Sequence, residues 1–445
     1  MTFTKPSVVI VGAGELGAAT AVSLLRSGKY GRVTVIDRAA ELPAMDAASC
    51  DINKVVRFDY MDDDYSVLAR RAIDEWNKDE WKGIYHQTGV VVRGLHCEGF
   101  TGERVRRTLE NVRAKESSIK LLKTPEDFVS LLAPSPDIPV NPPGEEVRGY
   151  HNPVGGWANA SAAVNKLYEW LRELGGELVP AADMSELLFT PDGRDIRGVK
   201  CADGREFTAD RVIIALGSWT ASHPALKGLM SQGLIVATGQ TVAAIQLSPE
   251  DAKRYAKIPV SMHHDGSGYY SFPPNETGLV KFALHRAGYL SSTGVPRTAT
   301  DPEAAAFCEA NGLGWIPQES FRDLKHQMSI VYPELAKMPI AYTRMCWYSD
   351  VVDGDWVIDY SPEYPSLMIA SGGAGHAFKK FLPIIGDLIR ARFEDTLDPH
   401  HKKKWRITRT PAAEDPARTG MKRKPLDLKT LVRKQELVDG AVLRG

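Results

Sequence analysis

Few cysteines, no excess of charge and no long apolar run characterise this 445-residue sequence. The five cysteines stand apart without CxxC spacing, so neither a disulfide framework nor a zinc site is indicated. Lys and Arg total 55 against 56 Asp and Glu, which leaves no overall field to attract nucleic acid. No apolar stretch reaches the roughly 18 residues that span a bilayer, and residues 1–10 show no signal-peptide pattern. Because Val442-Leu443-Arg444-Gly445 is no peroxisomal address either, we expect a cytoplasmic protein without a membrane partner.

The strongest pattern lies at the N-terminus. Residues 7–11 (SVVIV) form an apolar run typical of a buried parallel strand, followed by a glycine-rich turn, a helical stretch and a second apolar run at 33–36. The turn contains Gly12, Gly14 and Gly17. These glycines permit a tight turn, close approach of the backbone to a pyrophosphate and close contact between helix and strand, and the helix N-terminus offers free N–H groups to the phosphates. The sequence therefore predicts a dinucleotide site.

The residues that follow indicate which dinucleotide is bound. Asp37, followed by Arg38, ends the second strand, where a carboxylate accepts a ribose hydroxyl and disfavours a 2′-phosphorylated cofactor. The alternation of strands and helices expected of an NAD-linked dehydrogenase stops there. It resumes only at 211–217 (RVIIALG), which runs into Gly217 and Trp219. This interruption favours FAD as the cofactor.

A second glycine-rich junction follows the predicted strand at 366–371 (SLMIAS). Gly373, Gly375 and His376 lie between this strand and an apolar helix from about Phe381 to Arg392. A junction of this kind aims backbone N–H groups and a helix dipole at an electron-rich group. We interpret it as another part of the cofactor site.

The length of the chain predicts two domains, since 445 residues exceed one ordinary hydrophobic core. The segments between the strands described above mix charged helical stretches, a Pro-rich loop and strand-like alternation, which indicates a mixed α/β fold with interleaved domains. We assign an FAD-binding domain to 1–84, 154–232 and 340–400, and a substrate domain to 85–153 and 233–339. Residues 401–445 hold 13 Lys or Arg against 5 Asp or Glu, so we expect a basic tail that is mostly solvated surface.

Four motifs carry a resemblance to a known family. They read DINKVVR at 51–57, GLVKFALH at 278–285, RMCWYSD at 344–350 and GHAFK at 375–379. In this order and spacing they resemble the monomeric sarcosine oxidase family, and within it most resemble the fungal amadoriases, or fructosyl amino acid oxidases. The resemblance implies a glutathione-reductase-type Rossmann domain, an interleaved substrate domain built on an antiparallel sheet, and a monomer. It also implies covalently held FAD and oxidation of a secondary amine by O2, with release of H2O2.

The resemblance implies roles for residues beside the flavin. Cys346 matches the cysteine whose sulfur bonds the flavin 8α-methyl carbon, and the neighbouring Arg344 would favour the thiolate that such a bond needs. Lys281 matches a lysine near flavin N5, where a cation stabilises negative charge on dioxygen as it receives electrons. The junction at His376 matches backbone that lies under the pyrimidine end of the ring and stabilises charge there.

The resemblance also implies how the substrate is held. Arg57 and Lys379 match two cations that clamp the substrate carboxylate. Lys379 is also expected to contact the cofactor. A guanidinium binds a carboxylate through two parallel N–H bonds, and an ammonium adds a second point charge. Lys54 is placed nearer the flavin or the rim of the pocket. His285 and Tyr270 match a histidine and an aromatic residue that face the flavin and shape the surroundings of the amine.

His285 is where the sequence departs from the amadoriases, which carry an acidic residue that contacts the sugar-bearing amine. A neutral imidazole does not neutralise a substrate ammonium in that way. An N-methyl or larger N-alkyl amino acid, or a related specialised metabolite, is therefore favoured as substrate. A fructosyl amino acid, saccharopine and pipecolate are alternatives within the family. An NAD-linked dehydrogenase and a non-catalytic FAD-binding protein are alternatives outside it. No metal is expected at His263-His264-Asp265, because adjacent residues of a strand point to opposite faces.

Overall fold

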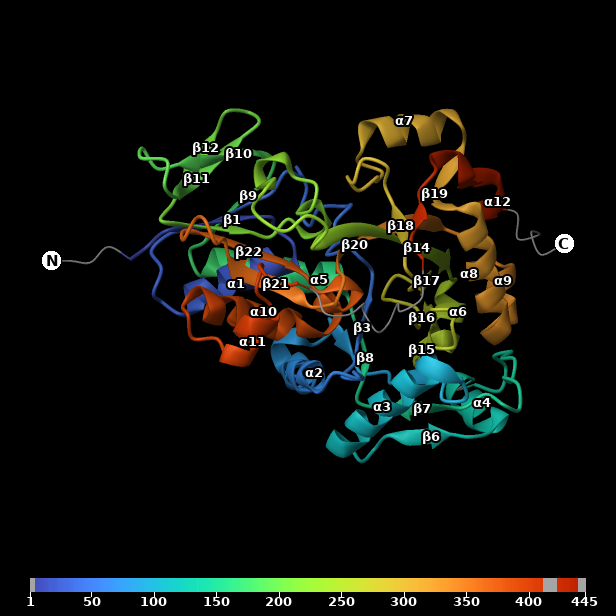
Figure 1. The fold of residues 1–445 in the computed structure, drawn as a ribbon. Helices are drawn as coiled ribbons and strands as arrows, with labels where there is room; N and C mark the ends of the chain where they lie inside the picture. Colours follow the sequence, from blue (N-terminus) through green and yellow to red (C-terminus); the bar gives the residue numbers. More distant parts are fainter. Residues whose placement is uncertain (1–4, 134, 411–421, 439–445) are drawn as a thin grey trace.

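A computed structural model describes residues 5–133, 135–410 and 422–438, and the side chains of residues 374 and 377–380 lie outside the described part. Two large sheets and the helices that cover them make up most of the chain (Figure 1). Among the described residues, none of the helices combines the length and apolar character that a membrane crossing requires.

The first sheet is built from the short apolar runs of the sequence. Its order is β21-β22-β13-β1-β2-β9, parallel throughout except for β21. The strands are β1 (Val8–Val11), β2 (Val33–Ile36), β9 (Glu177–Val179), β13 (Arg211–Ile214), β21 (Trp356–Tyr360) and β22 (Leu367–Gly372). Both faces of this sheet are covered, which is why its central strands are apolar at nearly every position.

Successive residues of β1 point alternately to the two faces of this sheet, and each face packs against a different layer. Val8 and Ile10 pack in one core with the helices α1 (Glu15–Arg26), α5 (Ala160–Glu173) and α10 (Ala377–Phe393). Val9 and Val11 pack in another core, beneath a three-stranded antiparallel sheet. That sheet consists of β10 (Met184–Phe189), β11 (Ile196–Cys201) and β12 (Glu206–Thr208). The strands predicted at 7–11, 33–36, 211–217 and 366–371 are thus present, and the predicted final helix begins slightly earlier, at Ala377.

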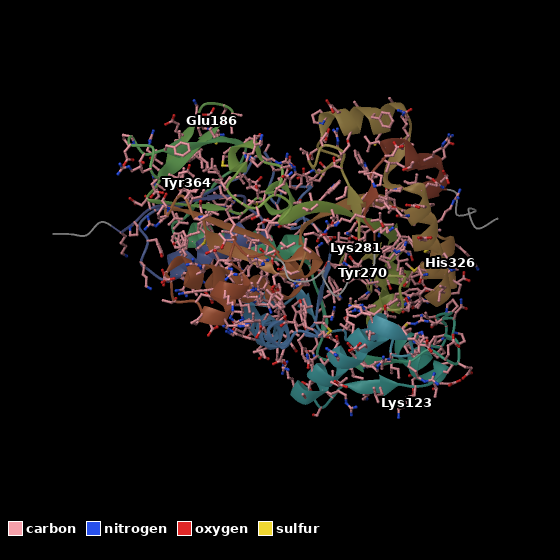
Figure 2. The ribbon with its side chains drawn as sticks, in the orientation of Figure 1. Lys123, Glu186, Tyr270, Lys281, His326 and Tyr364 are labelled. Carbon is pink, nitrogen blue, oxygen red and sulfur yellow. The ribbon has the colours of Figure 1, made fainter. Side chains whose placement is uncertain are left out.

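The second sheet has ten strands and is antiparallel except where β15 pairs with β5 and β23 with β18. Its strands are β5 (Val90–Arg93), β6 (Lys120–Leu122), β7 (Gly149–Asn152), β14 (Ile235–Gln246), β15 (Val260–His263), β16 (Tyr269–Ser271), β17 (Leu279–Leu284), β18 (Tyr289–Leu290), β20 (Tyr342–Val351) and β23 (Lys424–Pro425). Figure 2 shows Tyr270 and Lys281 close together on this sheet, on the side where it borders the part of the molecule built on the six-stranded sheet.

One face of the ten-stranded sheet carries its own core. Ile245 and Phe282 pack there against Leu324 and Met328 of α8 (Gln318–Val331). The helices α4 (Pro125–Leu132), α6 (Pro249–Tyr255) and α9 (Pro333–Lys337) contribute to the same core. Val92, Tyr270 and Ala283 belong instead to the core that contains α1 and α10. The opposite face of the sheet is therefore joined by apolar packing to the part of the molecule built on the six-stranded sheet.

Strand β20 follows directly after the predicted domain boundary at residue 340, yet it belongs to the ten-stranded sheet. It pairs with β14 over its whole length, Tyr342–Val351. The segment assigned to the FAD-binding domain thus begins inside the ten-stranded sheet. A small sheet of β3 (Lys54–Val56), β8 (Gly156–Ala158) and β4 (Tyr85–His86) and the helices α2 (Asp63–Trp76) and α3 (Gly99–Lys115) complete this region. The domain boundaries themselves stay a prediction.

The basic tail is attached to the rest of the fold at a few buried residues and ion pairs. Trp405 and Val432 are fully buried, and Lys404 and Arg409 form ion pairs with Asp62 and Asp353, respectively. The tail contains α11 (Pro399–Lys404), β24 (Leu431–Arg433) and α12 (Lys434–Val438). Strand β24 pairs with β19 (Leu313–Pro317), which follows α7 (Pro302–Ala310) in the sequence. A few interspersed apolar side chains of the tail thus reach a core, while the expectation that the tail is mostly solvated surface stays a prediction.

The close contact between α1 and α10 predicts the effect of one substitution. A Cβ at Gly386 of α10 would overlap with the carbonyl of Ala19 in α1. Helix propensity alone would make Gly386→Ala stabilising by about 1 kcal/mol. Overpacking typically costs about 1–3 kcal/mol, so we expect a net lower melting temperature. Thermal unfolding followed by circular dichroism measures it.

Gly28→Ala is the matched control, because Gly28 has φ +67° but no atom within 4 Å of its added Cβ. Gly28→Ala should lower the free energy of unfolding only by the cost of a Cβ on a left-handed backbone, about 1 kcal/mol. A melting temperature that rises in Gly386→Ala would contradict the close packing of the two helices.

Candidate active site

Two cavities meet at Gly375. The glycine-lined cavity has a volume of about 480 Å³ and the arginine-lined cavity about 320 Å³. The predicted cofactor residues that line the first are Gly12, Gly14, Asp37, Arg38, Lys54, Gly217, Trp219 and Gly375. The predicted residues that line the second are Arg57, Tyr270, His285, Gly375 and His376. The structure therefore brings most of the predicted site together, in two adjoining chambers.

Five predicted residues are not among the described residues that line either cavity: Gly17, Gly373, Lys281, Cys346 and Lys379. Gly17 does not line the cavity. It lies behind Gly12, and a Cβ at Gly17 would overlap with the carbonyl of Gly12. Gly373 has φ +75° and donates its N–H to the carbonyl of Asp355. The side chain of Lys379 lies outside the described residues, so its predicted role stays a prediction.

The glycine-lined cavity has the features that a dinucleotide requires. Asp37 Oδ2 accepts from the N–H of Ala13 at 2.8 Å and Oδ1 from that of Ala39 at 2.9 Å, which fixes the carboxylate at the end of β2. The Arg38 guanidinium lies 4.5 Å from the ring centroid of Trp219 and pairs with Asp46. Helix α1 begins at Glu15 without a side-chain cap from Gly14, and the N–H of Glu15 donates to Ser49 Oγ at 3.0 Å. The positive end of the helix dipole at this N-terminus favours a phosphate group.

Buried polar atoms beside this cavity fit a polar ligand. Glu15 Oε1 and both amide atoms of Asn53 have no hydrogen-bond partner among the described residues. Burial raises the pKa of Glu15 well above its ordinary value, although Lys54 opposes the shift, and the protonated carboxyl that burial favours can donate to an acceptor such as a phosphate oxygen. Buried polar atoms are rarely left without partners, and the residues present therefore fit a bound dinucleotide.

A buried charge cluster of Asp51, Lys54, Lys281, Arg344 and Cys346 borders this cavity. Asp51 Oδ2 lies 2.6 Å from Lys54 Nζ and accepts a hydrogen bond from Lys281 Nζ at 2.8 Å. Lys281 is 1% exposed, contrary to the usual solvent-facing lysine of a strand, and also donates to the carbonyl of Asn53 at 2.5 Å. One carboxylate thus holds two ammonium groups.

The cluster sets the protonation of its members. Burial alone would raise the pKa of Asp51, but Lys281, Lys54 and Arg344 hold it well below its ordinary value. Burial opposes the charge of Lys54, yet Asp51 raises its pKa above the ordinary value. For Lys281 burial wins and lowers the pKa to about 8. All three groups are therefore charged at neutral pH, and Lys281 loses its proton first as the pH rises.

Cys346 lies within this cluster rather than on a cavity surface. Its Sγ is 3.8 Å from Lys54 Nζ, and Lys54 lines the glycine-lined cavity. Arg344, which the sequence suggested as the cation that favours a thiolate, donates to the backbone carbonyls of Ala47 and Cys50. The ammonium nearest the sulfur is thus that of Lys54. Neither Cys346 nor Lys281 is among the residues that line the two cavities.

Arg57 presents its guanidinium to the arginine-lined cavity. It donates to the backbone carbonyl of Asp59, while its buried Nε has no partner among the described residues. Asp59 is itself held by Asn152 Nδ2 at 2.8 Å. Because a guanidinium binds carboxylates bidentately, a donor left over in a cavity is what a carboxylate ligand would satisfy.

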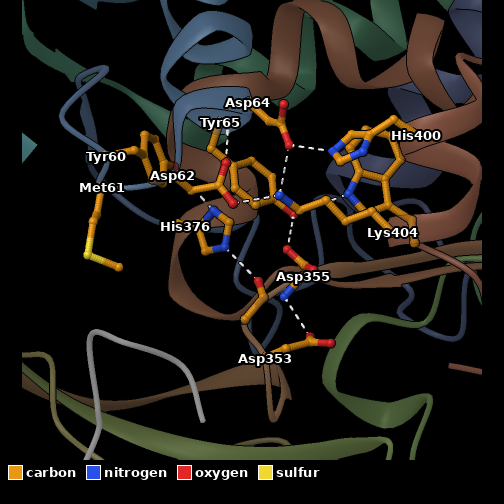
Figure 3. Close-up of polar contacts among 12 residues, drawn as sticks. Tyr60, Met61, Asp62, Asp64, Tyr65, Asp353, Asp355, His376, His400 and Lys404 are labelled. Carbon is orange, nitrogen blue, oxygen red and sulfur yellow. Dashed lines mark hydrogen bonds and ion pairs between the residues drawn. The ribbon is translucent and has the colours of Figure 1, made fainter. Parts of the chain in front are cut away.

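A polar network fixes the wall of the arginine-lined cavity that carries His376 (Figure 3). The carbonyl of Gly354 accepts from His376 Nε2 at 2.7 Å, and Nδ1 of the same ring is hydrogen-bonded to the Tyr60 hydroxyl at 3.2 Å. Tyr65 donates to Asp355 at 2.7 Å, and burial raises the pKa of Asp355 to about 6. Lys404 binds Asp62 and Asp64 at the start of α2.

Three residues of this site were missed by sequence reasoning. Tyr348 lines the glycine-lined cavity, its ring centroid is 6.0 Å from that of His285, and a Cβ at Gly375 would overlap with it. Its position two residues after Cys346 on a strand was a usable signal, because both then face the same side. Asp51 opens a motif that was recognised without a role for its carboxylate. Arg104 lines the arginine-lined cavity from α3 and had no signal in a helix rich in charge.

Among the described residues, no group of three or more His, Cys, Asp or Glu side chains could hold a metal ion. His263 Nδ1 and Asp265 Oδ2 are 4.0 Å apart, and burial lowers the pKa of His263 to about 3.

A dinucleotide site on a parallel sheet, joined to a second cavity with an arginine and aromatic residues, defines a flavin-type oxidoreductase. The chain matches the family model described as FAD dependent oxidoreductase over residues 7–392, and it belongs to that family. The preference for FAD over an NAD-linked dehydrogenase is thereby confirmed, as is the mixed α/β fold.

Individual relatives extend over nearly the whole chain. The chain is 29% identical to the L-saccharopine oxidase of Schizosaccharomyces pombe, with 90% of this chain and 92% of the relative covered. It is 24% identical to a monomeric sarcosine oxidase of a Bacillus species, with 87% and 91% covered. The solved structure of Amadoriase II, a fructosamine oxidase from Aspergillus fumigatus, has a TM-score of 0.77 at 26% identity, with 97% and 96% covered. The resemblance to sarcosine oxidases and amadoriases is confirmed.

The shared carboxylate of the charge cluster predicts a large effect of Asp51→Asn. The substitution leaves two buried ammonium groups without a counter-charge, and breaking a buried pair typically costs about 3–5 kcal/mol. The loss should be largest at the acid end of the range, where the lysines of the variant are charged against burial; Asp51 raises the pKa of Lys281 in the wild type, so the variant loses this proton at a lower pH. It should shrink toward pH 10, because loss of a proton relieves a lysine whose folded pKa is depressed. Thermal unfolding between pH 6 and 10 measures it.

Glu169→Gln provides the control, since it breaks a pair between the exposed side chains of Lys166 and Glu169. Exposed pairs contribute little, so its melting temperature should follow the wild type at every pH. An Asp51→Asn deficit that grows with pH would refute the assignment of the cluster's charges.

Proposed function

We propose that this chain is a covalent-FAD amine oxidase that oxidises the C–N bond of an N-substituted amino acid bearing an N-methyl or larger N-alkyl group. The observation that carries the proposal is Arg57, whose buried Nε lacks a partner among the described residues in a cavity that adjoins the cofactor cavity at Gly375. Tyr270 and His285 line the same cavity. A carboxylate on Arg57 would place the rest of an amino acid beside them.

The reaction removes one hydrogen from carbon and one from nitrogen of the secondary amine. The resulting imine is hydrolysed by water to a carbonyl compound and a primary amine. FAD, when bound, supplies the acceptor for the two electrons, and O2 takes them up with two protons as H2O2. The amine must be neutral to release a hydride equivalent from carbon, so a cavity that prefers the neutral amine lowers the barrier.

The side chains of the cavity favour that neutral form. Burial raises the pKa of Tyr270 well above its ordinary value, so its hydroxyl remains protonated and uncharged. His285 stands where the amadoriases carry an acidic residue, and a neutral imidazole does not stabilise a substrate ammonium as a carboxylate would. Lys281 is protonated at neutral pH and supplies the fixed positive charge that stabilises reduced dioxygen.

A fructosyl amino acid is the second candidate substrate. The similarity to Amadoriase II at 26% identity favours it. His285 disfavours it, for the reason given above. The relative from Schizosaccharomyces pombe is named for saccharopine, a larger N-alkyl amino acid, and its 29% identity supports the leading proposal.

The covalent link is proposed at Cys346. It is supported by the Lys54 ammonium 3.8 Å from Sγ, since a neighbouring cation favours the thiolate that such a bond needs. A cytoplasmic location and a monomeric state stay predictions, as does the part of Lys379 in the carboxylate clamp.

Peroxide release from the purified protein tests the function. The panel consists of N-methyl amino acids, saccharopine, pipecolate, and fructosyl derivatives of glycine, valine and lysine. We expect H2O2 from the N-alkyl substrates. Arg57→Ala should raise KM by roughly 10- to 100-fold, because it removes a charged bidentate contact to the carboxylate. A coupled peroxidase assay measures both.

Turnover of fructosyl substrates alone would replace the leading proposal by the second candidate. No peroxide and no anaerobic bleaching of the flavin with any member of the panel would reject both. Arg70→Ala is the control for Arg57→Ala, since Arg70 lies on α2 and lines neither cavity.

Cys346→Ser tests the covalent link. After acid precipitation, the flavin of the wild type should remain in the pellet, whereas the flavin of the variant should appear in the supernatant. Cys308→Ser, at a buried cysteine of α7, is the control and should behave as the wild type. Flavin retained in the Cys346→Ser pellet would place the link elsewhere.

A further inference from the structure

Lys281 lies on the face of the ten-stranded sheet that also carries Tyr270 (Figure 2). Its neighbour two residues along β17, Ala283, pairs with Tyr270, which lines the arginine-lined cavity. Residues two apart on a strand share a face, so Lys281 and Tyr270 are on the same side of the sheet. Lys54, which shares the carboxylate of Asp51 with Lys281, lines the glycine-lined cavity. The Lys281 ammonium is thus one shared carboxylate away from a residue of the cofactor cavity.

Two acceptors hold the Lys281 ammonium in place. Nζ donates to Asp51 Oδ2 at 2.8 Å and to the carbonyl of Asn53 at 2.5 Å, and it lies 4.9 Å from the ring centroid of Phe272. An ammonium has three N–H donors. The part of the chain that the structure describes provides no third hydrogen-bond acceptor for them. Asp51 and Asn53 therefore leave one donor of Lys281 for a small molecule.

The carboxylate of Asp51 is itself fixed. Its Oδ1 accepts from the N–H of Ile52 at 2.8 Å, and its Oδ2 lies 2.6 Å from Lys54 Nζ. The side chain of Asp51 is buried. Both acceptors of Lys281 thus come from the short segment 51–53, and the position of this segment determines where the remaining N–H of the ammonium points.

The same contact favours the charged form of Lys281. Burial lowers the pKa of Lys281 to about 8, Lys54 acts in the same direction, and Asp51 and Cys346 oppose the shift. Arg344 acts on this group of charges by lowering the pKa of Asp51. Without Asp51, burial and Lys54 together would favour the neutral amine. The carboxylate thus contributes both the place and the charge of the ammonium.

We propose that Asp51 is a positioning residue for the reduction of dioxygen, and that its contact with Lys281 directs one ammonium N–H at the oxygen molecule. Two electrons from the reduced cofactor and two protons convert O2 to H2O2, and the ammonium stabilises the negative charge that develops on oxygen. Asp51 acts only through Lys281. This inference rests on the function proposed above, which gives Lys281 its role toward dioxygen.

Reoxidation of the chemically reduced holoenzyme tests the proposal without any amine. The flavin is titrated to full reduction with dithionite under anaerobic conditions and mixed with aerated buffer between pH 6 and 10, and its absorbance gives the rate constant. The wild-type rate should fall as the pH rises through about 8, where Lys281 loses its proton. Asp51→Asn should reoxidise roughly 10- to 100-fold more slowly at pH 7. Its fall with pH should begin earlier, because the carboxylate that raises the pKa of Lys281 is gone.

Further variants separate the position of the carboxylate from its charge. Asp51→Glu moves the carboxylate by one methylene, so it should reoxidise more slowly than the wild type but keep the fall near pH 8. Lys281→Met should be slow at every pH. Adding Asp51→Asn to Lys281→Met should cause no further loss, because Asp51 acts through Lys281. Lys54→Met should move the fall to higher pH, since Lys54 lowers the pKa of Lys281.

Thermal unfolding of the same variants gives a readout that does not involve dioxygen. Asp51→Asn leaves two buried ammonium groups without their shared carboxylate, and Lys281→Met removes one of them. The double variant should therefore melt at a higher temperature than Asp51→Asn alone. Asp359→Asn is the control for the loss of a largely buried carboxylate, because Asp359 pairs with Arg392 at 2.6 Å and lines neither cavity. It should lower the melting temperature and reoxidise at the wild-type rate.

The proposal is refuted by an Asp51→Asn enzyme that reoxidises as the wild type does at every pH, or by a double variant that is markedly slower than Lys281→Met. If neither protein retains flavin, Asp51→Glu decides, and a wild-type rate at every pH in that variant refutes a positioning role. Failure of the proposed function has a different signature. In that case no amine would bleach the flavin, whereas the dithionite-reduced enzyme would still report on Asp51.

Discussion

The carboxylate of Asp51 lies between the ammonium groups of Lys54 and Lys281, at 2.6 and 2.8 Å, and all three side chains are buried. Removing three charges from water costs several kcal/mol per ion unless the geometry compensates for it. Strand β3 with the loop before it, and strand β17, carry these side chains and are therefore held in one arrangement. Because Lys54 lines the cofactor cavity and contacts Cys346 on β20, this arrangement fixes the boundary between the cofactor site and the substrate sheet.

Strand β20 makes the two halves of the molecule interdependent. It hydrogen-bonds to β14 of the substrate sheet, while Tyr348 on the same strand lines the cofactor cavity. The ring of Tyr348 fits because Gly375, at the start of α10, has no Cβ. A shift of the substrate sheet would move the wall of the cofactor site with it. Sites at which a substrate must meet a cofactor need such coupling, since misplacement by about 1 Å can cost orders of magnitude in rate.

Much of the cofactor site could be predicted from sequence because it depends on backbone. Gly12 and Gly217 line the cavity as expected, since a turn that approaches a pyrophosphate leaves no room for a side chain. The burial of Lys281 came from the resemblance, because an isolated lysine on a strand gives no local signal. Arg104 and the carboxylate of Asp51 act through tertiary contacts that join segments more than a hundred residues apart, as in the pairs Arg104–His264 and Asp51–Lys281. Local patterns carry no information about such pairs. The same holds for the tail, where Trp405 is buried by contacts that its basic surroundings do not suggest.

The ion pairs of that tail have a consequence for how the enzyme matures. Lys404 and Arg409 bind Asp62 and Asp353, two residues of the arginine-lined cavity. The strands of both sheets, apart from β23, precede them in the sequence. Since a nascent chain folds from its N-terminus as it is synthesised, both sheets can pair before the cavity wall closes. This wall of the cavity thus closes after the strands of the substrate sheet, apart from β23, have been synthesised.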